Sequence, residues 1–102
     1  MNFGEAIKAL KEGKCISREG WNGKGMFVFK QVPAEIDNDI IPKMQSVPES
    51  AKKILTTRNQ EPIFYTNQMV IVHPTGRIDS WAPSSSDIFA EDWFEVEAYS
   101  KQ

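Results

Sequence analysis

One amphipathic helix pattern opens the chain and limits the folds that the rest can adopt. Its apolar residues follow the i, i+3, i+4, i+7 spacing of a single helix face, at Phe3, Ala6, Ile7 and Leu10. Asn2 stands at the N-cap position with Glu5 three residues later, which is the arrangement of a capping box. Gly13 can take the left-handed conformation that often ends a helix. The pattern predicts a helix over residues 3–12.

Short strand patterns make up most of the remaining sequence. The predicted strands are, in chain order, 14–18, 26–29, 63–65, 69–72, 78–81 and 93–99. Met26 to Phe29 is apolar on both faces, which is typical of a strand that is central in its sheet or faces a subunit interface. Asn22-Gly23 and Pro74 to Arg77 carry the residues of tight turns. We therefore predict an α+β fold, with the N-terminal amphipathic helix packed on an antiparallel β-sheet.

Residues 33–62 interrupt this strand pattern. Four prolines fall in the range, at Pro33, Pro42, Pro48 and Pro62. Ser46 to Glu49 has the form of a helix start with a capping box, and a short apolar helical face continues to about Thr57. A single helical turn is expected later, over 87–91, with Ser86 as its cap. We predict one domain, residues 1–102, in which 33–62 is an insertion between strands that carries one short helix.

The composition excludes several classes of protein. Twelve Lys and Arg residues stand against 14 Asp and Glu residues, a net charge of -2, and this balance does not suggest a nucleic-acid binder. One cysteine allows no internal disulfide. No apolar run reaches the roughly 20 residues of a membrane-spanning helix, and no signal-peptide core is present. We expect a cytoplasmic protein that binds neither nucleic acid nor membrane.

Few side chains are suited to catalysis or metal binding. His73 and Cys15 could form a nucleophile pair, but nothing supplies a third group to orient them, and together they are too few for a zinc site. Asp87, Glu91 and Asp92 are candidates for acid–base catalysis, although charge at a helix end is the simpler interpretation. We expect no catalytic residue, no metal and no cofactor.

Trp21 and Trp81 are the stronger indication of a ligand site. Both stand beside turns that are rich in small and polar residues. An indole ring can stack on a nucleotide base, which contributes roughly 1–3 kcal/mol, while carboxylates and amides hold ribose and phosphate. Gly23 and Lys24 lie in a glycine-rich segment whose backbone amides could bind an anion, or which could be a plain hairpin turn. Periodicity alone equally allows both tryptophans to be core residues.

Two blocks of sequence resemble a known family. The first runs through Phe3-Gly4-Glu5-Ala6, Leu10-Lys11-Glu12-Gly13-Lys14 and Arg18-Glu19-Gly20-Trp21-Asn22-Gly23-Lys24-Gly25-Met26. The second, from Trp81 to Trp93, follows the pattern W-x-x-S-x-x-D-x-x-A-x-D-W. Together they resemble the small phage-encoded Thoeris anti-defence proteins of the second type, over about residues 2–31 and 68–97.

The resemblance implies a signal sponge rather than an enzyme. Members of this family bind the cyclic ADP-ribose isomers that bacterial TIR-domain defence enzymes make, so the effector is never activated. Some members also bind cyclic dinucleotides. They assemble as homotetramers with pockets between subunits. The expected function is therefore sequestration of a cyclic nucleotide signal, without cleavage, by a homo-oligomer in the host bacterial cytoplasm.

The resemblance also implies where the ligand binds. The expected ligand-binding residues are Trp21, Asn22, Gly23, Lys24, Trp81, Ser84, Ser85 and Asp87. Backbone amides with Lys24, Arg18 or Arg77 are candidates for contacting the two phosphates. Two alternatives stay open: an enzyme that degrades such a signal through the acidic residues near position 90, and a protein–protein inhibitor of a host defence component.

Overall fold

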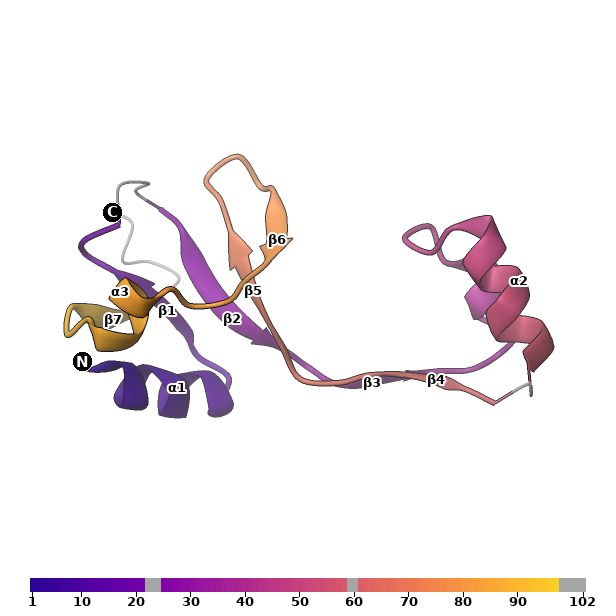
Figure 1. The fold of residues 1–102 in the computed structure, drawn as a ribbon, viewed down its shortest axis with the longest axis horizontal. Helices are drawn as coiled ribbons and strands as arrows, with labels where there is room; N and C mark the ends of the chain where they lie inside the picture. The colour runs from indigo at the N-terminus through magenta and orange to yellow at the C-terminus, as the bar shows by residue number, and fades with distance from the viewer. Residues whose placement is uncertain (22–24, 59–60, 98–102) are drawn as a thin grey trace. The chain divides into compact units, whose positions relative to one another are not determined.

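The computed structural model of the chain describes residues 1–21, 25–58 and 61–97. The chain divides into two compact units, Met1–Gln31 with Asn67–Gln102, and Val32–Thr66 (Figure 1). The elements of the first unit are α1 (Phe3–Lys11), β1 (Cys15–Arg18), β2 (Phe27–Gln31), β5 (Gln68–Val72), β6 (Ile78–Ser80), α3 (Ser85–Phe89) and β7 (Trp93–Val96). The elements of the second unit are β3 (Ala34–Ile36), the 3₁₀ helix η1 (Ile41–Lys43), α2 (Glu49–Arg58) and β4 (Ile63–Tyr65). That residues 1–102 form a single domain with an insertion stays a prediction.

Local sequence signals set both ends of α1. The Asn2 Oδ1 atom accepts a hydrogen bond from the Glu5 amide at 2.8 Å, and the Glu5 carboxylate accepts one from the Asn2 amide at 2.8 Å. At the other end Gly13 has a φ of 88°, and the Lys14 amide donates to the Ala9 carbonyl at 3.0 Å. The predicted capping box and left-handed glycine are both confirmed, and they satisfy backbone groups that a helix leaves unpaired at its ends.

The main sheet is antiparallel, with strand order β6-β5-β2-β1-β7. The predicted α+β class, with an N-terminal helix on an antiparallel sheet, is confirmed. β2 lies at the centre, as its two apolar faces suggested. β1 pairs with β7 from Cys15↔Val96 to Arg18↔Trp93, so the two blocks of sequence near the ends of the chain lie side by side.

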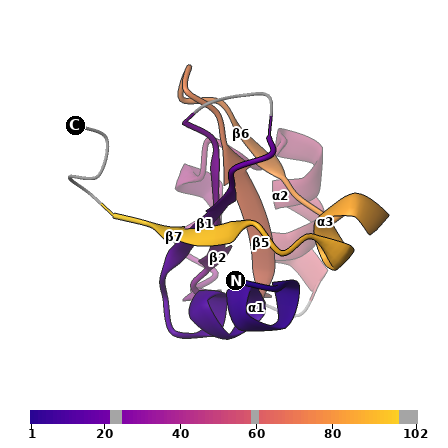
Figure 2. The ribbon, with the colours of Figure 1, turned by 90° about the vertical axis from the view of Figure 1, so that its left-hand side faces the viewer.

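The helix α1 and one face of the sheet enclose the core. The strand registers place Ile16, Val28 and Ile71 side by side. They are buried in one cluster with Ala6, Ala9, Leu10 and Trp93. Figure 2 shows α1 lying against β1, β2 and β7 at this face.

The opposite face of the sheet is apolar too. Because side chains alternate across a strand, the register assigns to this face, beside Cys15, Ser17, Gln31, Gln68 and Ser80, seven apolar residues: Phe27, Phe29, Val70, Val72, Ile78, Phe94 and Val96. We call these seven residues the open sheet face. None of them belongs to the core cluster or packs against it, and Ile78 and Phe94 are 56% and 39% exposed.

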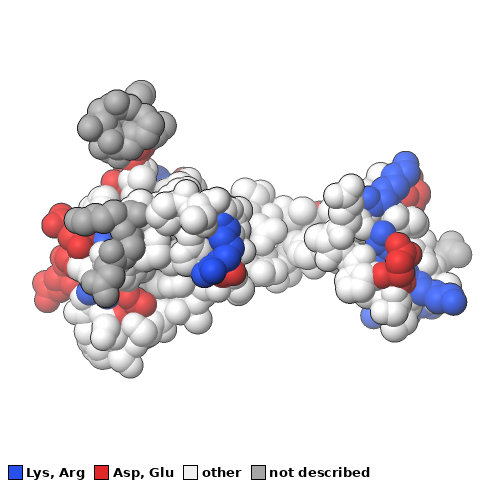
Figure 3. Space-filling model, turned by 90° about the horizontal axis from the view of Figure 1, so that it is seen from above, with Lys and Arg blue, Asp and Glu red and all other residues white. Residues whose placement is uncertain are grey.

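The second unit has little core of its own. β3 and β4 pair antiparallel from Ala34↔Tyr65 to Ile36↔Ile63. α2 has no buried residue, and Ile41 of η1 is the buried residue among those described in this unit. Figure 3 shows acidic and basic side chains intermingled on the surface of the unit that carries α2.

Two predicted helix starts are wrong. Ser86 does not cap α3, which runs over Ser85–Phe89 rather than 87–91; the cap is Ser84. A capping box needs an acidic side chain three residues after the cap, which Ser84 finds in Asp87, whereas three residues after Ser86 stands the apolar Phe89. Ser46 likewise precedes the helix, since α2 begins at Glu49.

The three-residue strand β3 and the 3₁₀ helix η1 were not predicted, because prolines on either side hide segments this short. Strand β7 ends at Val96, and the predicted extension of this strand beyond residue 97 lies outside the described residues. The same is true of the predicted Asn22-Gly23 turn. No helix in the described part of the chain is long and apolar enough to span a membrane.

Candidate functional site

Three tryptophans from distant parts of the sequence meet on the core side of the sheet. Trp21 follows β1, Trp81 follows β6, and Trp93 begins β7. The ring centroids are 6.2 Å apart for Trp21 and Trp81, 5.3 Å for Trp21 and Trp93, and 6.1 Å for Trp81 and Trp93, each pair edge to face. We call these three residues the tryptophan cluster.

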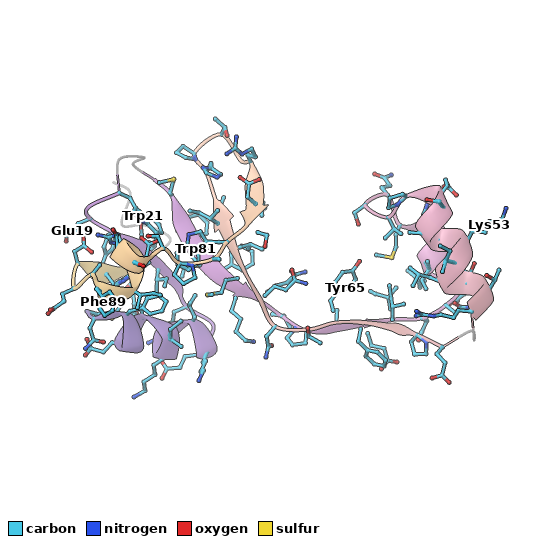
Figure 4. All side chains as sticks on the ribbon, viewed as in Figure 1. Glu19, Trp21, Lys53, Tyr65, Trp81 and Phe89 are labelled. Carbon is cyan, nitrogen blue, oxygen red and sulfur yellow. The ribbon has the colours of Figure 1, made fainter. Side chains whose placement is uncertain are left out.

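The three rings of the tryptophan cluster differ in how far they are buried. Trp93 is 2% exposed and also packs on Phe3 of α1, at a centroid distance of 5.6 Å. Trp21 and Trp81 are half-buried and pack on the core from outside. Figure 4 shows Trp21 and Trp81 near α3. The Trp21 and Trp81 rings are therefore partly accessible to solvent, whereas the Trp93 ring is buried in the core.

An arginine lies beside Trp93 and joins two carboxylates. Arg18 ends β1, and its Nη1 donates to Asp87 Oδ1 while its Nε donates to Asp92 Oδ1, both at 2.8 Å. The Arg18 side chain is 17% exposed, and its Cζ lies 6.0 Å from the centre of the Trp93 ring. This planar fork of donors binds two partners in fixed directions, which a lysine cannot do.

The Asp87 carboxylate makes four hydrogen bonds. Its Oδ1 accepts from Arg18 Nη1 and from the Trp21 indole Nε1 at 3.0 Å. Its Oδ2 accepts from the Ser84 amide at 2.9 Å and from the Ser84 hydroxyl at 3.0 Å. Its backbone carbonyl accepts from Trp93 Nε1 at 3.0 Å. Asp87 therefore orients two of the three tryptophans.

Asp92 ties down the segment between Arg18 and Trp21. Its Oδ2 accepts from the Gly20 amide at 2.7 Å, and its backbone carbonyl accepts from the Glu19 amide at 3.2 Å. We call Arg18, Gly20, Trp21, Asp87 and Asp92 the arginine cluster.

The charges in the arginine cluster stabilise one another. Hydrogen bonds from Arg18 and from the Gly20 amide hold the pKa of Asp92 below its usual range. Burial alone would raise the pKa of Asp87, but hydrogen bonds from Ser84, Trp21 and Arg18 outweigh it, so this pKa is also lowered. Hydrogen bonds to Asp92 and Asp87 raise the pKa of Arg18. All three groups are ionised at neutral pH.

This arrangement suits binding better than proton transfer. The Asp87 and Asp92 carboxylates are committed to hydrogen bonds, and a carboxylate with a lowered pKa is a poor general acid near neutral pH. His73 lies against Asp79 at 3.0 Å in the β5–β6 hairpin, with β2 between β5 and the β1 strand of Cys15. No group of three potential metal ligands occurs within residues 1–21, 25–58 and 61–97.

The structure places the predicted site residues unevenly. It brings Trp21, Trp81, Ser84 and Asp87 together, whereas Ser85 is an exposed residue in the first turn of α3. Asn22, Gly23 and Lys24 lie outside the described residues. Arg77 pairs with Asp79 through its Nε at 2.9 Å, in the β5–β6 hairpin.

Sequence reasoning missed the third tryptophan and the role of the two aspartates. Trp93 was interpreted as a motif residue and as the start of the last strand, and Asp92 as a motif residue and a possible acid–base group. The position of Arg18 in its strand could have indicated this role. Arg18 lies two residues after the core residue Ile16, so its side chain is on the core face, where a charge needs partners.

Comparison with known proteins identifies the family of the chain. The Thoeris anti-defense 2-like domain family matches residues 1–96. The protein "Thoeris anti-defense 2" of Bacillus phage SP01 is 34% identical over 93 residues, which is 91% of this chain and 91% of that protein. The similarity thus extends through residues 33–62, which the two sequence blocks did not include.

Proposed function

This chain belongs to the Thoeris anti-defense 2-like family, and from that premise we propose that it binds and sequesters a cyclic ADP-ribose-type signal without cleaving it. Membership of a Thoeris anti-defence family supports action against Thoeris defence in a phage-infected bacterium. A sponge would act in the host cytoplasm, where TIR-domain enzymes release the signal. The ligands of this chain would be cyclic ADP-ribose isomers, with cyclic dinucleotides as a second class.

The half-buried pair Trp21 and Trp81 is the observation that supports this proposal. A cyclic ADP-ribose isomer carries an adenine base, two riboses and a diphosphate. The base offers an aromatic face for stacking, which contributes roughly 1–3 kcal/mol. A sponge must outcompete a receptor, so it needs a dissociation constant near 1 nM, about -12 kcal/mol. Rings that are already ordered lose little entropy on binding, which favours such affinity.

Binding without cleavage is supported by the state of the acidic residues. Asp87 and Asp92, which could have served as acid and base, are ion-paired with Arg18 instead. A calorimetric titration with a cyclic ADP-ribose isomer, followed by heat denaturation and chromatography, tests both parts. Tight binding with the ligand recovered intact is expected. A new product peak contradicts the sponge, and absence of binding redirects the search to cyclic dinucleotides or a protein target.

Trp81→Ala tests the site directly. Loss of one stacking surface is expected to weaken binding about 5- to 150-fold, the equivalent of roughly 1–3 kcal/mol. Phe64→Ala is the matched control, because Phe64 is an exposed aromatic residue of the second unit, at 65% exposure. Equal affinity of both variants and the unchanged protein would place the ligand elsewhere.

The open sheet face supports assembly as a homo-oligomer, for which we propose a tetramer. On this side of the sheet the register assigns seven apolar residues, three of them aromatic, beside a few uncharged polar ones and no charged residue, and a lack of charge with aromatic enrichment is typical of the centre of subunit interfaces. Phe29→Glu would place a carboxylate opposite Val70 in this face. We expect light scattering to show about four times the 11.6 kDa chain mass before this change and a smaller species after it. Phe64→Glu serves as the control.

A further inference from the structure

We infer that Arg18 is a positioning residue, which holds the Trp21 ring in its ligand-binding orientation through Asp87 and Asp92. The inference rests on the proposed function for its binding consequence, since Trp21 is one of the two accessible rings. Its geometric part can be measured without ligand. It assigns to Arg18 and both aspartates a role different from phosphate, ribose or acid–base chemistry.

Arg18 holds the Trp21 ring from two sides. Through Nη1 it fixes Asp87, whose same oxygen atom accepts the Trp21 indole N–H. Through Nε it fixes Asp92, whose other oxygen accepts the Gly20 amide, one residue before Trp21. The Trp21 side chain and the backbone amide of the preceding residue are therefore both linked to the same guanidinium, each through one carboxylate.

Gly20 contributes to this network because it has no side chain. A Cβ atom at this position would lie 2.8 Å from Asp92 Oδ2, closer than Cβ atoms come to other groups, and 3.3 Å from Arg18 Nη2, which is a tight contact. The carboxylate cannot simply move away, since Arg18 holds its other oxygen. An alanine at position 20 would thus disrupt the network while leaving every charge in place.

A second cation at the other end of β1 provides a matched control. Lys14 also lies between two carboxylates, at 3.4 Å from Glu12 and 3.6 Å from Glu95. Its side chain is 49% exposed, against 17% for Arg18. No tryptophan hydrogen bond runs to Glu12 or Glu95 in the described part of the chain, so loss of Lys14 removes a similar charge without releasing a ring.

The experiment combines two readouts on four variants. Arg18→Lys and Gly20→Ala disrupt the arginine cluster by different means. Lys14→Gln is the charge control, and Ile71→Val is the stability control, because it removes one buried methylene from β5, which β2 separates from the β1 strand of Arg18. The indole N–H signals of ¹⁵N-labelled protein report the environment of each tryptophan, and calorimetry with a cyclic ADP-ribose isomer reports affinity. Both are measured well below each variant's Tm.

We expect the Trp21 indole signal to move in Arg18→Lys and Gly20→Ala, with the dissociation constant roughly tenfold higher. Lys14→Gln and Ile71→Val should stay within about twofold of the unchanged protein, even where Ile71→Val lowers the Tm equally. A purely structural role would instead make affinity follow the Tm in all four variants, and that result would overturn the inference.

Failure of the proposed function gives a different pattern. If the unchanged protein binds no cyclic nucleotide, the sponge proposal fails, yet the Trp21 signal still tests the positioning role. An unmoved Trp21 signal in both cluster variants would contradict the role of Arg18 whatever the ligand. If one of the two variants does not fold, the other still decides, because the two changes act through different atoms.

Discussion

The two units of this molecule differ in how much apolar surface they bury. The first unit encloses seven apolar residues in one cluster, whereas Ile41 is buried in the described part of Val32–Thr66. Exposed large apolar side chains do not separate the units, since the described residues include Val32, Ile40, Ile54 and Phe64 in the second and Ile78, Ile88, Phe89 and Phe94 in the first. The difference lies in what is buried. Since burial of apolar surface is the main source of stability, the first unit can hold its own fold, and the second has little with which to do so.

The largest expected effect comes from Trp93→Ala. It removes a buried ring and the bond to the Asp87 carbonyl, which should lower the free energy of unfolding by about 3–5 kcal/mol. The counterpart in the second unit is Ile41→Ala. All three tryptophans lie in the first unit, so urea unfolding followed by tryptophan fluorescence should barely register the Ile41 change. An equal loss from both variants would mean that the units unfold as one.

Asp87→Asn is expected to have the next largest effect, a loss of about 2–3 kcal/mol at pH 7, because it leaves Arg18 with a buried neutral partner. The pKa of Asp87 is lowered in the fold, so its contribution is present above the unfolded pKa of about 3.9 and is lost as the pH falls through the lower folded value. The variant should therefore lose less stability than the unchanged protein on acidification from pH 5 to pH 2.

The matched ion pair of the second unit is Lys52 with Glu49, where the Glu49 side chain is 89% exposed. Glu49→Gln should change stability by less than about 0.5 kcal/mol. If Glu49→Gln lowered the free energy of unfolding as much as Asp87→Asn does, the burial of an ion pair would not determine its contribution to stability.

Helix caps give a smaller contrast. Asn2→Ala removes the α1 capping box and should cost about 1 kcal/mol. Ser46→Ala should cost nearly nothing, because α2 begins three residues later. Thermal unfolding followed by circular dichroism measures both. A similar loss from Ser46→Ala would indicate that α2 extends further toward the N-terminus than residue 49.

Removal of the second unit should have the smallest effect on the first. β2 and β5 are paired up to Gln31↔Gln68, so replacing residues 32–67 by Asn-Gly would close a two-residue hairpin. We expect the shortened chain to keep its tryptophan fluorescence and its stability to within about 1 kcal/mol. Loss of the folded signal would show that the first unit needs the second.

The first unit was largely predictable because its signals are local and strong. The capping box at Asn2, the continuous apolar runs of β2 and β5, and the turn at Pro74 to Arg77 each involve neighbouring residues. The second unit was predicted less well, since its strands are short and its apolar pattern is weak. Patterns between neighbouring residues therefore gave little information about the structure of this unit.

The arrangement of the candidate site was predicted in part, and its role in ligand binding stays a prediction. Trp21 and Trp81 were found as a pair, but the register that brings Trp93 beside Arg18 depends on strand pairing between opposite ends of the chain. Ser86 was chosen over Ser84 because a run of three serines gives the same local signal. In the structure Asp87 decides between the serines, because its side chain forms the capping box with Ser84. Asp87 also accepts a hydrogen bond from Arg18, 69 residues away.

The arginine cluster also affects the order in which parts of the chain can fold during synthesis. Its bonds join residues that are 66 to 74 positions apart, and contacts between such distant residues form late because a long loop must close first. On the ribosome, Arg18 and Trp21 emerge well before Asp87 and Asp92 are synthesised. A nascent chain therefore cannot complete the hydrogen bonds that hold its first tryptophan until the segment through Asp92 has been made, so a product truncated before Asp87 would lack the arginine cluster.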